Sequence, residues 1–69
     1  MNKKTPTYHV AVYRPTLIAF SPDVIGFYSF DSVSKVIQLI SEHNLKLKAK
    51  CEEYDDNGEV EAIVYYCEE

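Results

Sequence analysis

Residues 45–67 read LKLKAKCEEYDDNGEVEAIVYYC, and this stretch predicts a β-hairpin. From residue 45 to residue 51, apolar side chains at odd positions alternate with lysines at even positions, which is the period of a half-buried strand. Residues 55–58 are turn formers, and Asn57-Gly58 is the strongest short hairpin signal in the chain. Residues 60–67 are apolar and aromatic enough to form the return strand.

The register of this hairpin predicts which side chains share a face. A two-residue turn at Asn57-Gly58 and a four-residue loop over 55–58 assign the side chains to the same two faces. One face would carry Leu47, Ala49, Cys51, Val60, Ala62, Val64 and Tyr66. We expect this apolar face to lie under a helix, with Cys51 pointing inward and Cys67 outward. Because neither turn brings the two cysteines opposite each other, we expect two free thiols and a reducing, cytoplasmic compartment.

The rest of the chain predicts two more strands and one helix. Residues 8–13 and 25–30 have strand character, and residues 32–43 have helical spacing, with an N-cap at Asp31 or Ser32. Asn44 suits a left-handed helix end. The predicted helical stripe is Val33, Val36, Ile37 and Ile40.

The order of these elements is therefore ββαββ. It predicts one α+β domain over residues 1–69, with residues 1–6 flexible. The domain would have a four-stranded, mostly antiparallel sheet with one helix on one face. Segment 14–24 is ambiguous, because Pro15 and Pro22 bracket its apolar run 17–20, and it could be a strand, a core loop or a binding loop.

Length and composition argue against most other classes. The chain has 69 residues, a formal charge of −4, two cysteines and two glycines. No apolar run approaches the roughly 18 residues that a membrane span needs, and the start of the chain lacks the apolar core of a signal peptide. The scattered cysteines and histidines do not have zinc-site spacing, and a Gly-rich phosphate loop is missing. We therefore expect no metal, no cofactor and no catalysis.

A single helix cannot cover both faces of a sheet, so the second face is left for water or for a partner. From the hairpin, that face would carry Lys48, Lys50, Glu52, Tyr54, Glu61, Ile63, Tyr65 and Cys67. The first strand would add either His9, Ala11 and Tyr13 or Tyr8, Val10 and Val12. The second strand would add part of the set Phe27, Tyr28 and Phe30.

Charge is divided unequally along the chain. Residues 1–50 hold seven basic and three acidic residues, a net of +4, whereas residues 51–69 hold eight acidic residues and no basic one, a net of −8. The acidic hairpin could be a prong that imitates phosphates on a basic, nucleic-acid-binding surface, or a solvated tip that keeps the protein soluble. Three lysines beside eight acids argue against direct nucleic-acid binding. The predicted partner-binding residues are Glu52, Tyr54, Asp55, Asp56, Glu59, Glu61, Ile63 and Tyr65.

In size, charge and predicted architecture the chain resembles small phage- or plasmid-encoded proteins that bind and inhibit a host machine, anti-CRISPR proteins among them. The resemblance assigns no role to any residue. It implies a non-catalytic protein-interaction module that inhibits a host nucleic-acid-handling machine by steric or charge occlusion. The alternative is a small structural or regulatory subunit that dimerises through the open sheet face.

Overall fold

The computed structural model describes residues 5–14 and 23–69. The elements are β1 (Thr7–Arg14), β2 (Asp23–Phe30), α1 (Val33–Glu42), β3 (Lys46–Tyr54) and β4 (Val60–Glu68). This confirms the predicted ββαββ order. Most of the ambiguous segment 14–24, and most of the segment expected to be flexible, lie outside the described residues.

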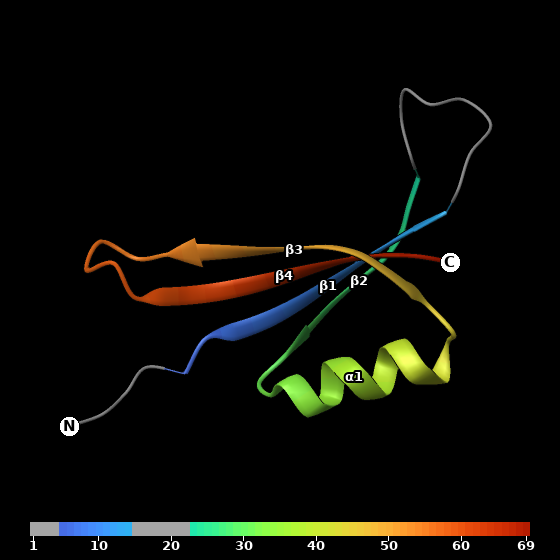
Figure 1. Cartoon of the computed structure of the whole chain (residues 1–69), viewed down its shortest axis with the longest axis horizontal. Helices are drawn as coiled ribbons and strands as arrows, with labels where there is room; N and C mark the ends of the chain where they lie inside the picture. The colour runs from blue at the N-terminus through green and yellow to red at the C-terminus, as the bar shows by residue number, and fades with distance from the viewer. Residues whose placement is uncertain (1–4, 15–22) are drawn as a thin grey trace.

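The four strands form one mixed sheet in the order β2-β1-β4-β3. The β3–β4 hairpin is antiparallel as predicted, and β1 pairs antiparallel with β2. The two pairs join through a parallel pairing of β1 with β4. In this part of the chain β1 and β4 are therefore central, and β2 and β3 are the edges (Figure 1).

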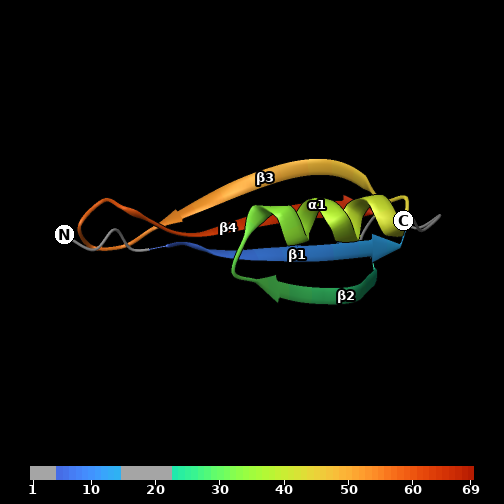
Figure 2. The same cartoon turned by 90° about the horizontal axis from the view of Figure 1, so that it is seen from below.

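α1 lies on one face of the sheet, where it packs against β1 and β2 (Figures 1 and 2). The core between the helix and the sheet consists of Val10, Val12, Val36 and Cys67. Partly buried side chains surround it: Tyr8, Phe30, Leu39, Ile40, Leu45 and Tyr65. The hairpin loop of β3 and β4 extends beyond the N-terminal end of α1 (Figure 2).

The predicted facing of the hairpin is wrong. Cys67 and Tyr65 pack on the helix side, and Cys67 is 1% exposed, although both were expected on the open face. Val64, expected under the helix, alternates with them and lies on the opposite face. The error arose because β4 is a central strand with apolar residues on both faces, so its composition does not indicate which face meets the helix.

The helix is also rotated from the predicted stripe. Val36 is 1% exposed and Leu39 and Ile40 pack beside it, whereas Ile37 is 61% exposed. Ser32 is the N-cap residue by backbone geometry, but its side chain makes no capping hydrogen bond. The left-handed end at Asn44 is confirmed, with a φ of 52°.

The turn of the β3–β4 hairpin differs from both predicted forms. The Asp55 N–H donates to the Glu59 carbonyl at 2.9 Å, so Asp56, Asn57 and Gly58 form a three-residue loop. The Gly58 N–H donates to the Asp55 carbonyl at 3.0 Å, and Gly58 has a φ of 80°. This is a type I turn followed by a left-handed glycine, a common hairpin form that the Asn-Gly signal does not distinguish.

Candidate interaction surface

The sheet face opposite α1, here called the outer face, has no other described helix or strand on it. The strand registers place fifteen residues there: Thr7, His9, Ala11, Tyr13, Val24, Phe27, Ser29, Lys46, Ala49, Cys51, Glu53, Ala62, Val64, Tyr66 and Glu68. Of the two alternatives left open for the first strand, the structure selects His9, Ala11 and Tyr13 for this face.

Aromatic rings cross the outer face in two stacked pairs. His9 stacks on Phe27 with the ring centroids 5.4 Å apart, and Tyr13 stacks on Tyr66 at 6.2 Å. The His9 ring is also held by a 2.8 Å hydrogen bond between its Nδ1 and the Ser29 hydroxyl. The rings are thus oriented by neighbours on adjacent strands, which lowers the entropy that binding would cost.

Small residues lie between these rings and are buried without a covering helix. Ala11, Ala62 and Val64 are all buried on this face, because short side chains in the middle of a sheet are shielded by larger neighbours. Side chains on the edge strand β2 stay accessible: Phe27 is 60% exposed and Val24 is 59% exposed. The outer face therefore has an apolar centre with raised aromatic groups, bordered by the charged residues Lys46, Glu53 and Glu68, and this is a composition that favours protein interfaces.

The acidic hairpin uses one of its carboxylates to build its own loop. The Asp55 carboxylate accepts hydrogen bonds from the Asn57 N–H at 2.9 Å and from the Glu59 N–H at 3.0 Å. This arrangement assigns Asp55 to loop structure rather than to partner contact. Asp56 and Glu59 are exposed at the tip.

The predicted partner-binding residues do not form one surface. Glu52, Ile63 and Tyr65 lie on the helix side of the sheet, and the Tyr54 hydroxyl donates to Glu52 Oε1 on that side at 3.4 Å. Asp56 and Glu59 lie at the hairpin tip. Glu61 is exposed on β4, where the pairing with β3 is irregular close to the tip.

The aromatic residues of the outer face were not among the predicted contacts. Strand alternation already grouped His9 with Tyr13, but the residue that decides the face is Val10, which is fully buried. Nothing in the local sequence indicates that Val10, and not Ala11, faces the helix.

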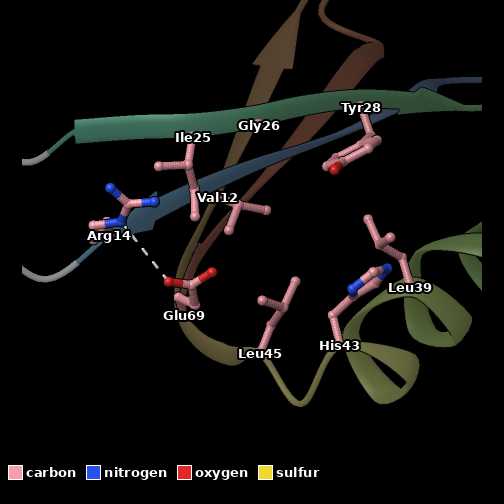
Figure 3. A pocket seen from close by; sticks show the side chains of 9 residues that line it. All are labelled: Val12, Arg14, Ile25, Gly26, Tyr28, Leu39, His43, Leu45 and Glu69. Carbon is pink, nitrogen blue, oxygen red and sulfur yellow. Dashed lines mark ion pairs between the residues drawn. The ribbon is translucent and has the colours of Figure 1, made fainter.

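A cavity of about 320 Å³ lies between α1, β1, β2 and the C-terminus (Figure 3). Its wall combines aliphatic with polar and charged side chains, and Arg14 pairs with Glu69 at its rim, Nε to Oε1 at 3.9 Å. The Glu69 N–H donates to the Tyr13 carbonyl at 3.0 Å and fixes the end of the chain there. The residues that line it are Val12, Arg14, Ile25, Gly26, Tyr28, Leu39, His43, Leu45 and Glu69.

Neither cysteine is in a disulfide: Cys51 is exposed on β3 and Cys67 is buried. Burial raises the pKa of the Cys67 thiol, so this group stays protonated at neutral pH. Among the described residues no cluster of three or more His, Cys, Asp or Glu side chains has the arrangement of a metal site.

Among residues 5–14 and 23–69, no helix is long and apolar enough to cross a membrane. Comparisons with protein-family models, with curated proteins and with solved structures found no match.

Proposed function

We propose that this protein is a non-catalytic protein-interaction module that binds its partner through the outer face, assisted by the acidic hairpin. The observation that carries the proposal is the exposure of Phe27 and Val24 on an apolar sheet face on which no described element packs. Leaving such side chains in water costs free energy that a docked partner would recover.

The charge of the second hairpin indicates the kind of partner. Residues 51–69 carry eight acidic and no basic residues, and Asp56 and Glu59 project from the exposed tip. Such a field accelerates association with a basic surface and orients it on approach. We therefore propose a cytoplasmic protein partner with a basic surface, such as one that handles nucleic acid, which this chain would inhibit by occlusion as small phage-encoded inhibitors do.

The test is affinity capture from a lysate of the source organism, with two matched pairs of variants and quantitative mass spectrometry. Phe27→Ser removes the raised ring of the outer face, and Ile37→Ser removes an equally exposed apolar side chain from α1. Glu59→Lys reverses a charge at the hairpin tip, and Glu42→Lys reverses one at the exposed end of α1.

We expect one protein to be retained by the wild type and by both α1 variants, and to be lost with Phe27→Ser. Glu59→Lys should weaken its capture, and added salt should weaken it further. Binding of the purified partner should then be lost with Phe27→Ser and be blocked by the nucleic acid it handles. If Phe27→Ser and Ile37→Ser retain the partner equally, binding through the outer face is contradicted. If only nucleic acid is captured, a protein partner is contradicted.

A further inference from the structure

β3 is an edge strand that is exposed along its whole length. All nine residues of Lys46–Tyr54 are exposed, and within the described part of the chain β3 has β4 as its one neighbour in the sheet. One row of its backbone N–H and C=O groups is therefore available to another strand. Between the two register irregularities, which fall at Leu47/Ala49 and Glu53/Tyr54, residues 49–53 pair regularly with β4.

The charges of β3 are arranged in two halves. Lysines occupy positions 46, 48 and 50, and glutamates occupy positions 52 and 53. When a strand of this kind pairs antiparallel with a second copy of itself, the basic half of each lies beside the acidic half of the other. From this complementarity we propose that two copies of the chain associate through β3, forming one continuous sheet across a two-fold axis.

Symmetry and charge together define the register. A two-fold axis normal to the sheet keeps each side chain on the same face of the joined sheet. Because directly opposite residues share a face and neighbours along a strand do not, the axis must pass beside a residue that lies opposite its own copy. An axis at Lys50, Glu52 or Glu53 opposes a residue to its own charge, and an axis at Ala49 opposes Lys48 to Lys50, all of which are unfavourable. An axis at Cys51 places Lys50 opposite Glu52 of the second copy, twice by symmetry.

This register fits the regular part of the strand. Cys51 is the middle residue of the regular stretch 49–53, and Lys50 and Glu52 lie on the same face because they are two residues apart. The other edge, β2, shows no such division, since Asp23–Phe30 contains one charged residue. The pairing also joins the two outer faces into one, but it does not depend on the outer face binding any partner.

The test is the oligomeric state of charge variants, measured by sedimentation equilibrium. The wild type should show a monomer–dimer equilibrium. Lys50→Glu and Glu52→Lys should each weaken dimerisation by about tenfold or more, because each change makes two like-charge pairs. An equimolar mixture of the two variants should dimerise again, and so should the double variant carrying both changes.

Cys51 supplies an independent readout. Opposite residues in an antiparallel pair have Cα atoms about 4.5–5.5 Å apart, within disulfide range. Oxidation with diamide should therefore convert the wild type to a covalent dimer rapidly. A Cys51→Ser variant with Glu42→Cys on α1 should form a covalent dimer only slowly, through random collision.

A wild type that stays monomeric over the accessible concentration range overturns the proposal and assigns the β3 lysines to blocking edge pairing. A dimer that persists unchanged in Lys50→Glu and Glu52→Lys overturns it as well, because the interface then lies elsewhere. Circular dichroism of each variant checks that the fold is kept.

Discussion

Cys51 and Cys67 have the same side chain and opposite environments. Cys51 is exposed on the edge strand β3, and Cys67 is buried in the core beside Val12 and Val36. Residue type alone gave no means of telling them apart, and the sequence-based prediction assigned them the wrong way round. What separates them is position in the sheet, since β4 is central and its helix side meets α1.

Replacing each cysteine by serine should therefore have different effects. Cys67→Ser places a hydroxyl in an apolar core and should lower the free energy of unfolding by about 1–3 kcal/mol. Cys51→Ser should change it by less than about 0.5 kcal/mol, because an exposed site is tolerant. Urea denaturation measures both values. Equal losses would mean that Cys67 does not lie in the core.

At the scale of the element, α1 shows that helical spacing predicts a helix more reliably than it predicts the buried side of that helix. The apolar residues of the segment cover more than one side: Val33, Val36, Ile37, Leu39 and Ile40. The helix buries the side that carries Val36, Leu39 and Ile40. The choice depends on how the helix crosses β1 and β2, which the helix sequence does not contain.

Truncating two neighbouring residues of α1 tests this orientation. Val36→Ala should cost about 2 kcal/mol of unfolding free energy, because it leaves a cavity in a thin core. Ile37→Ala removes more carbon atoms but should cost less than about 0.5 kcal/mol, since its side chain is largely in water. Thermal or urea unfolding gives the comparison. A larger loss for Ile37→Ala would show that the helix is turned the other way.

At the scale of the whole molecule, the described residues form one sheet with a helix on part of one face. The parallel pairing of β1 with β4 joins two hairpins that are far apart in the sequence. This pairing makes β1 and β4 central, and it creates both the outer face and the free edge of β3. The two proposed interaction surfaces therefore follow from one long-range contact.

Hydrogen exchange tests this arrangement across the molecule. Amides of β1 and β4 should exchange most slowly, because central strands are paired on both sides. Alternate amides of β2 should exchange fast. Alternate amides of β3 should exchange faster as the protein is diluted, since dilution dissociates the proposed dimer. Protection of β2 that equals that of β1 would contradict the strand order.

The sequence by itself determined the element order, the position of the β3–β4 turn and the left-handed helix end at Asn44. These depend on contacts between residues close in the chain, such as strand alternation and the special backbone angles of Asn and Gly. Only the tertiary structure decided which face of the sheet meets α1, and with it the burial of Cys67 and the exposure of Phe27. The physical reason is that β1 and β4 carry apolar residues on both faces, so the face that meets the helix is set by packing between distant segments.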